Sequence, residues 1–261
     1  PNTQRDSCFA EAQIFKPSLL ARLERALTDA VRILLPSVIA IGCAVAFVAF
    51  LVAGYRSLGL LGVLALMPAV ALALAYVAII ITAMVKEILT GTHGPVVKPL
   101  WSRYVWHNEL VNGLYETIAA AAMQPLMGTP LIAPCLRMMG CKIGKWCFID
   151  TTLFSEFDLV EIGDRACLNL GATIQTHLFE DRIFKADHLK IGDGCTVGNM
   201  AVVLYGTEME AGAALGPLSV LMKGETLPAS THWHGIPCER VARPRATGPA
   251  PVAGSRPDQP L

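Results

Sequence analysis

His177 is a candidate for moving a proton, and two carboxylates that could assist it, Glu180 and Asp181, lie near it in the sequence. A neutral imidazole accepts a proton near physiological pH and can act as a general base. One of the carboxylates could orient that ring or bind a cationic substrate, whereas Arg182 could neutralise both in a salt bridge. A histidine that only occupies a turn is the structural alternative.

The sequence around His177 repeats every six residues. It reads IGDRAC, LNLGAT and IQTHLF from Ile162, then IGDGCT, VGNMAV, VLYGTE, MEAGAA, LGPLSV, LMKGET and LPASTH from Ile191. Ile143 and Ile149 open an earlier, less regular pair of units. A six-residue apolar period fits a solenoid in which three short strands form each triangular coil. We expect the aliphatic residue or Met that opens each unit to point inward, with small residues at the corners.

Added residues at 180–190 interrupt the period directly after the unit of His177. Extra residues in a solenoid form a loop extruded from one face, which is often the binding face. His188 within this loop is a second candidate site residue, or a solvated loop histidine. His232 and His234 are expected to close the last coil, since terminal repeats need a polar cap.

Two uncharged apolar stretches precede the repeats, over residues 33–55 and 57–85. Each exceeds the roughly 20 residues that a helix needs to cross a bilayer. A short link at residues 54–57 predicts a two-helix transmembrane hairpin that returns the chain to its starting side. Basic residues flank the hairpin on that side, which predicts a multi-pass protein of the inner membrane with its bulk in the cytoplasm. A signal peptide followed by one span is the alternative, disfavoured because no cleavage signature follows.

These patterns predict five segments. They are an amphipathic segment over 1–32, the hairpin over 33–100, a helical linker over 101–140, the β-helix over 141–242 and a disordered tail over 243–261. The linker aromatics, which are Trp101, Tyr104 and Trp106, could be headgroup anchors or ordinary core residues. A formal net charge of +0 offers nothing to nucleic acid. The eight cysteines form no CxxC pair, which favours reduced thiols and no metal.

The repeats resemble those of the hexapeptide-repeat acyltransferases, which fold as a left-handed parallel β-helix. Their terminal Gly-x-Pro-Ala-like motif is similar to Gly235–Cys238, which departs from it in the last position. The segments WSRYVWHNELV, DTTLFSEFDLVEIGD, TIQTHLFEDR and LGPLSVLMKGETLP, behind two apolar stretches, more closely resemble a membrane-bound terminal condensation-like domain of nonribosomal peptide synthetases. That domain type is the one of ε-poly-lysine synthetase, and the resemblance covers most of residues 27–241.

The resemblance implies an enzyme that forms amide bonds. An aminoacyl thioester on the phosphopantetheine of a carrier domain would pass to the amine of a free amino acid, possibly lysine, or of a peptide. His177 would be the catalytic base, since thioester aminolysis needs an unprotonated amine and a proton acceptor. The other expected site residues are Glu180 and Asp181 in catalysis, with Arg182, His188, Gly216 and Ser219 in substrate binding.

The implied partners are thiolation (carrier) and adenylation domains, the lipid bilayer, and further copies of the same domain in a homotrimer or tandem pseudo-trimer. Two alternatives stay open: an acetyltransferase that uses coenzyme A, and a non-catalytic membrane scaffold of a synthetase. Coenzyme A would require a basic patch near the last coils, where the candidates are Lys223, Arg240, Arg243 and Arg245.

Overall fold

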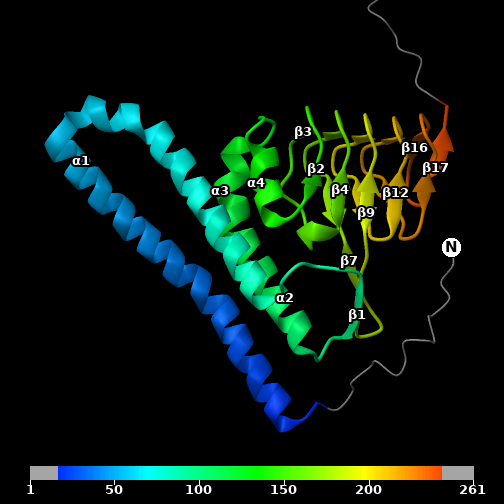
Figure 1. Cartoon of the computed structure of the whole chain (residues 1–261), viewed down its shortest axis with the longest axis horizontal. Helices are drawn as coiled ribbons and strands as arrows, with labels where there is room; N and C mark the ends of the chain where they lie inside the picture. The colour runs from blue at the N-terminus through cyan, green and yellow to red at the C-terminus, as the bar shows by residue number, and fades with distance from the viewer. Residues whose placement is uncertain (1–16, 243–261) are drawn as a thin grey trace, which may run out of the picture.

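The computed structural model describes residues 17–242 and contains a long bent helix, a layer of short helices and a β-helix (Figure 1). The predicted tail at 243–261 and residues 1–16 of the predicted amphipathic segment lie outside the described residues. The short helices stand between the long helix and the β-helix (Figure 1). The three parts therefore follow one another in space as they do in the sequence.

The β-helix has three faces, each a sheet of stacked parallel strands. One face contains β3 (Phe148–Ile149), β5 (Cys167–Leu168), β10 (Thr196–Val197), β13 (Ala214–Leu215) and β16 (His232–His234). The second contains β6 (Thr173–Gln175), β11 (Val202–Leu204) and β14 (Val220–Leu221). The third contains β2 (Lys142–Ile143), β4 (Val160–Ile162), β9 (Leu189–Ile191), β12 (Thr207–Met209) and β15 (Thr226–Leu227). The predicted three-sided parallel β-helix is confirmed.

The residues that open the hexapeptides form ladders inside the coil. Leu168 is in register with Val197, and Val197 with Leu215, and all three are buried. The same holds on the second face for Ile174 and Val203. Each buried aliphatic side chain contributes about 1.5–3 kcal/mol through removal from water, and this is what holds such short strands in register. The predicted inward direction of these residues is confirmed.

The repeated Ile-Gly-Asp sequence sets how closely successive coils stack. A Cβ added to Gly163 would lie 2.6 Å from the backbone nitrogen of Asp193, so only glycine fits. Asp193 accepts a hydrogen bond of 2.7 Å from the backbone N–H of Asp164, one coil away. At the far end of the solenoid, β17 (Glu239–Val241) pairs antiparallel with β16 and ends the parallel stacking.

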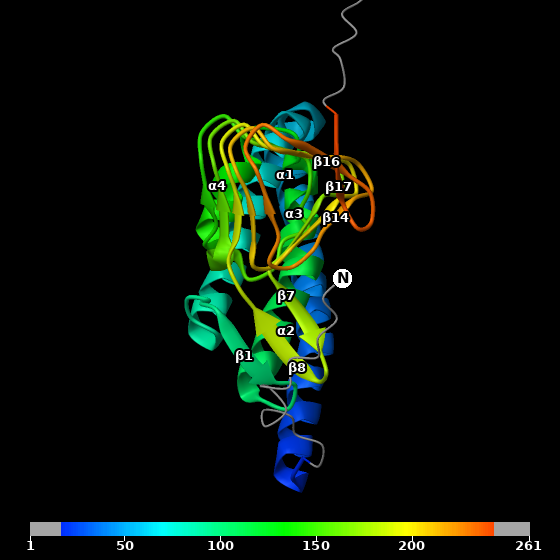
Figure 2. The same cartoon turned by 90° about the vertical axis from the view of Figure 1, so that its right-hand side faces the viewer.

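The insertion after His177 is an ordered hairpin rather than a loop. Strands β7 (His177–Glu180) and β8 (Ile183–Ala186) pair antiparallel, and β1 (Val96–Pro99) adds to β8 as a third strand. The hairpin projects from one corner of the coils and lies beside α2 (Figure 2). The predicted extrusion at 180–190 is therefore partly wrong in its limits, because residues from Leu189 onward already belong to β9.

Five short helices fill the predicted linker. They are α2 (Arg103–Leu114), the π-helix η2 (Tyr115–Ala119), α3 (Ala120–Met123), the 3-10 helix η3 (Gln124–Leu126) and α4 (Ile132–Met139). The buried residues of η2, α3, η3 and α4 form one core cluster with the coils of the solenoid, whereas α2 contributes Val105 and Trp106 to a second, smaller cluster. Trp106 is buried against Phe184 of the hairpin, and its indole N–H donates to the carbonyl of Leu100. Trp106 is thus an ordinary core aromatic.

The helix α1 (Leu19–Leu89) is one element of 71 residues, long and apolar enough to cross a membrane. Its backbone leaves the helical conformation only at Gly59, with φ 69° and ψ 179°, and two arms diverge from this bend (Figure 1). The predicted two-helix hairpin with a link at residues 54–57 is therefore wrong in detail, because a single glycine makes the bend without a loop. The expected boundary at Arg32 also falls inside the helix.

Candidate active site

His177 hydrogen-bonds to a buried carboxylate that the sequence did not single out. Its Nδ1 lies 2.7 Å from Oε2 of Glu156. Glu156 sits just before the 3-10 helix η4 (Phe157–Leu159) with φ 32° and ψ 66°, a left-handed conformation. The Glu156 side chain is fully buried, and the His177 side chain is 15% exposed. The pair thus joins a carboxylate held inside the protein to an imidazole at its surface.

The Glu156 carboxylate is held ionised despite its burial. Removal from water alone would raise its pKa, but the hydrogen bond and charge of His177 oppose this, as do hydrogen bonds from Asn108 and Thr176. The net result is a pKa of about 2. The Asn108 amide donates to Oε1 at 2.7 Å, and the Thr176 hydroxyl lies 2.7 Å from Oε2. Every side of the carboxylate is therefore occupied by a donor.

This environment determines which nitrogen of His177 carries the proton. An ionised carboxylate can only accept a hydrogen bond, so Nδ1–H must donate to Glu156. In the neutral ring, Nε2 then holds a free lone pair, and no residue within the described part of the chain donates to it. The geometry gives the tautomer required of a general base that receives a proton at Nε2.

Two aromatic rings fix the plane of the imidazole. Phe184 of β8 stacks on His177 with ring centroids 4.9 Å apart and planes at 29°. Phe179 of β7 meets it edge-on at 5.4 Å. Both come from the inserted hairpin, so the hairpin positions the ring while Glu156 orients its proton.

A chain of buried polar groups continues from Glu156 to the end of α1. Oδ1 of Asn108 lies 3.0 Å from Nε2 of His93, and Nδ1 of His93 lies 3.0 Å from Oδ2 of Asp158. The same Asp158 oxygen is 2.6 Å from Nζ of Lys86, in the last turn of α1. The long helix and the histidine are thus connected through four side chains.

Both ring nitrogens of His93 lie within hydrogen-bond distance of a polar side chain in this network. Burial alone would raise the pKa of Asp158, but hydrogen bonds from His93 and Lys86 lower it to about 2, so this carboxylate only accepts. The Asn108 amide already donates to Glu156, which leaves its oxygen to accept from His93. His93 thus connects Asn108 to Asp158, and Lys86 is the cation that pairs with Asp158.

The two carboxylates predicted beside His177 lie elsewhere. Glu180, at the far end of β7, forms ion pairs of 2.6 Å with Lys223 and 3.1 Å with Lys185. Asp181 and Arg182 form the turn of the hairpin, with φ 49° and 67°. His188 is exposed, beyond the hairpin. The structure brings none of these side chains to the imidazole, and Glu156 occupies the orienting position instead.

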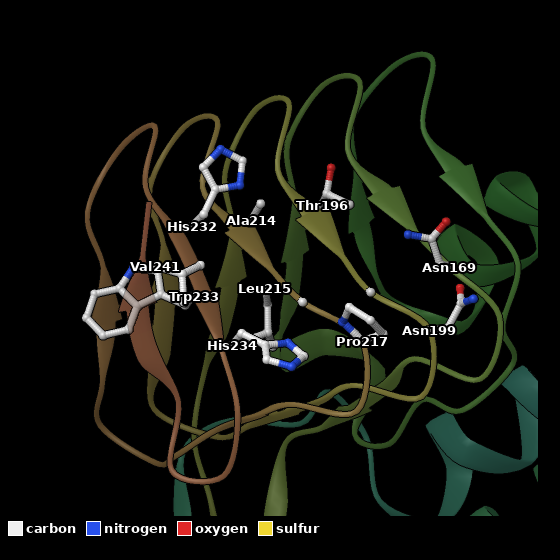
Figure 3. Close-up of a pocket in the computed structure, with 12 residues that line it drawn as sticks. Asn169, Thr196, Asn199, Ala214, Leu215, Pro217, His232, Trp233, His234 and Val241 are labelled. Carbon is white, nitrogen blue, oxygen red and sulfur yellow. The ribbon is translucent and has the colours of Figure 1, made fainter. Parts of the chain in front are cut away.

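Gly216 and Ser219 lie near the last coils, apart from His177 in the fold. Gly216 lines a cavity of about 600 Å³ with Pro217 and His234 (Figure 3). Asn169, Thr196 and Asn199 also line it, so amide and hydroxyl groups alternate with apolar surface. Ser219 is fully buried, and its hydroxyl hydrogen-bonds to the backbone N–H of Gly235 and lies 3.2 Å from Nδ1 of His234. Ser219 therefore supports the cavity wall rather than lining it.

Two further cavities meet at His177. One, of about 550 Å³, lies between the first coils and the η2–α3 segment, and Phe154 and Ile174 are among its apolar walls. The other, of about 370 Å³, is bounded by α2 and the first arm of α1. Glu116 also lines both cavities. A base at the junction of two cavities can serve a reaction with two substrates.

One sequence signal could have found Glu156. Ile162 lies thirteen positions after Ile149, one more than the length of two hexapeptides. The six-residue period is therefore interrupted there, as it is after His177. The structure places that interruption next to the inserted hairpin. The same irregular stretch contains Asp158, whereas Asn108 and His93 carry no such signal, because they lie in segments without a repeat.

Comparison with known proteins gives one similar sequence. The chain is 37% identical over 224 residues to the delta-poly-L-ornithine synthetase of Acinetobacter baumannii (strain AB307-0294), a match that covers 85% of this chain and 17% of that protein. The chain thus spans under a fifth of the length of its relative. A scan against protein-family models finds no match.

The solved structures that match part of this chain include acetyltransferases. A maltose O-acetyltransferase from Clostridium difficile 630 is 21% identical, with 40% of this chain and 59% of that chain covered and a TM-score of 0.33. A hexapeptide-repeat acetyltransferase from Vibrio cholerae is 14% identical, with 47% and 87% covered and a TM-score of 0.34.

Proposed function

We propose that this chain is a membrane-associated acyltransferase that forms amide bonds from aminoacyl thioesters. The observation that carries the proposal is the hydrogen bond from Nδ1 of His177 to the buried, ionised Glu156, which leaves Nε2 free at two cavities. The similarity to part of a poly-ornithine synthetase supports amide formation between amino acids. The acceptor would be the amine of a free amino acid or of a peptide.

The reaction needs one base and one acid. The acceptor amine attacks the thioester carbonyl carbon, and Nε2 of His177 takes the proton that the nitrogen loses. As the C–S bond breaks, the imidazolium returns this proton to the departing sulfur, and a free thiol and an amide remain. Glu156 holds the ring in place throughout and stabilises its cationic form.

The cavity at the last coils is suited to a pantetheine arm. Its polar side chains are uncharged amides, a hydroxyl and imidazoles, which match the amide groups of pantetheine, and its lining contains no Lys or Arg. Of the four basic residues that could bind nucleotide phosphates, Lys223 is paired with Glu180 and Arg240 is exposed on β17, outside the cavity lining, while Arg243 and Arg245 lie outside the described residues. We therefore favour a carrier-bound donor over coenzyme A.

Two further parts of the proposal concern assembly. The outward-facing apolar residues of α1 suit insertion in a lipid bilayer, where they would be removed from water. At one corner of the solenoid, exposed apolar side chains follow one another along the coils, namely Leu170, Met200, Leu218 and Ile236. The pantetheine cavity lies apart from the His177 of the same chain. The proposed reaction therefore requires a trimer in which a neighbouring copy covers this corner and brings its own His177 beside the cavity.

Product formation by the purified chain tests the proposal. The chain is supplied with lysyl or ornithyl thioesters of a carrier protein and the free amino acid, and in parallel with acetyl-CoA and the same acceptors. We expect dipeptide amides by mass spectrometry, reduced about 10²–10⁴-fold in His177→Ala because the general base is lost. His188→Ala, which changes an exposed histidine, is the matched control and should keep the rate. Acetylated products alone would favour the coenzyme A alternative, and no product with either donor would refute catalysis.

A further inference from the structure

Glu116 differs from the other carboxylates near His177 because it has no partner. Within residues 17–242, no hydrogen bond or ion pair holds its side chain, and it is exposed. Glu109, on the same side of the molecule, is paired with Arg25 at 2.5 Å and also contacts Arg32. Glu156 is enclosed by donors. Glu116 is therefore the carboxylate that remains available to a ligand at this cavity.

The cavity between the first coils and the η2–α3 segment carries a negative charge. Glu116 is the one Asp, Glu, Lys or Arg among the residues that line it, and His177 stands at the same wall. The remaining lining combines small or apolar side chains, such as Ala120 and Ile174, with the uncharged amides of Gln124 and Gln175. This combination suits a molecule with a cationic group on a short aliphatic stem and disfavours an anion.

Glu116 lines this cavity from an irregular turn of the backbone. The residue lies in the π-helical segment Tyr115–Ala119, an irregular turn between two α-helical segments. Tyr115 anchors that turn, since its hydroxyl donates to the carbonyl of Thr152 at 2.7 Å and its ring packs edge-on against Phe157. Such single π-turns alter the direction of side chains and occur often at functional sites. The carboxylate is thus presented from a fixed backbone.

We propose that this cavity binds the acceptor, and that Glu116 pairs with a second, protonated amine of that acceptor. This inference rests on the proposed function and names its substrate class: a short aliphatic diamine unit, as in a basic amino acid. The reacting amine is uncharged at Nε2 of His177, and the other amine remains an ammonium at Glu116. The carboxylate thereby selects acceptors with two amines over those with one.

Two matched acceptors test the selection. We compare 1,5-diaminopentane with 5-amino-1-pentanol, which replaces one amine by a hydroxyl, in amide formation by the full chain in detergent. The wild-type chain should prefer the diamine about 10–100-fold in kcat/KM, the range for one hydrogen bond to a charged group. Glu116→Gln should lose this preference, down to the factor of about two expected from two equivalent amines. Glu161→Gln, which removes an exposed carboxylate on another face, should keep it.

Direct binding separates this inference from the proposed function. By calorimetry, the dissociation constant of 1,5-diaminopentane should rise about 10–100-fold in Glu116→Gln and stay unchanged in Glu161→Gln. If binding depends on Glu116 but no amide forms, the cation site stands and the proposed reaction fails. If amides form and both variants keep the wild-type preference and affinity, the reaction stands and the role of Glu116 is refuted.

Discussion

Replacing Glu156 by Gln should invert the proton position on His177 while keeping the shape of the side chain. Asn108 donates to Oε1 of Glu156, so the new amide oxygen is expected to take that side. The new NH₂ group then faces His177 and Thr176, where Oε2 now accepts. The imidazole must accept at Nδ1 and carry its proton on Nε2, which is the wrong tautomer for a base.

The structure sets the size of this effect. A pKa lowered from 4.5 to about 2 corresponds to roughly 3 kcal/mol of net stabilisation of the ionised carboxylate, after the opposing effect of burial, since one pKa unit equals about 1.4 kcal/mol. A large part of that interaction comes from His177. Loss of the general base is worth about 10²–10⁴ in rate, and we expect kcat of Glu156→Gln to fall within this range.

Single-turnover amide formation measures the effect, with circular dichroism to confirm that the variant is folded. Glu180→Gln is the control, since it changes a carboxylate that pairs with Lys223 and Lys185 instead of the imidazole. Its kcat should stay within about threefold of wild type, because a part-exposed ion pair contributes little. Wild-type activity in Glu156→Gln together with inactivity in Glu180→Gln would refute the assignment of Glu156 as the orienting residue.

The remaining predictions concern pH, the buried network, assembly and the bend. Because the pKa of Glu156 is lowered from 4.5 to about 2, its contribution to stability is complete above pH 4.5 and is lost as the pH falls through 2; acid titration by circular dichroism should show this loss in wild type and not in Glu156→Gln. Asn108→Leu leaves His93 without its acceptor and should lower the free energy of unfolding by about 1–3 kcal/mol in thermal melts, and an unchanged melt would contradict the network. Leu218→Glu places a charge on the exposed apolar corner and should convert a trimer to monomers in light scattering, an expectation that fails if the active wild-type chain is already monomeric. Gly59→Ala puts a Cβ at φ 69° and should cost about 1–2 kcal/mol of stability, whereas a wild-type melting temperature would mean that the bend does not require glycine.

The solenoid core could be predicted from the sequence because its period lies along the chain. Each buried residue, such as Ile174 or Leu215, recurs six positions after another, and one side chain per strand enters the core. His177 was identifiable for the same reason, as it stands where the period breaks. The spacing of residues along the chain therefore predicts both the fold and the candidate base, His177.

The orienting residue could not be predicted in this way. Glu156 and His177 are 21 positions apart, and they meet only because two neighbouring coils stack. Glu180 is nearer to His177 in the sequence, but it lies at the opposite end of β7, where it pairs with Lys223. Distance along an extended strand grows by about 3.3 Å per residue, so three positions suffice to remove it from the ring.

The bend of α1 shows a related limit. Gly54 and Gly59 both lie near the middle of the apolar region, and composition does not distinguish them. Only the structure assigns the positive φ to Gly59, while Gly54 is buried where an added Cβ would lie 3.1 Å from a methyl group of Val63. One glycine makes the turn and the other permits close packing beside it.

The contact between Lys86 and Asp158 has a consequence for anyone who exchanges modules of this protein. A boundary chosen from hydropathy alone would fall after residue 89, at the end of the apolar helix α1. Removing α1 at that boundary would also remove Lys86. Asp158 would then lose the lysine that neutralises it inside the protein. A transplantable catalytic unit should instead begin before the last turn of α1, so that the final residues of the helix travel with the solenoid.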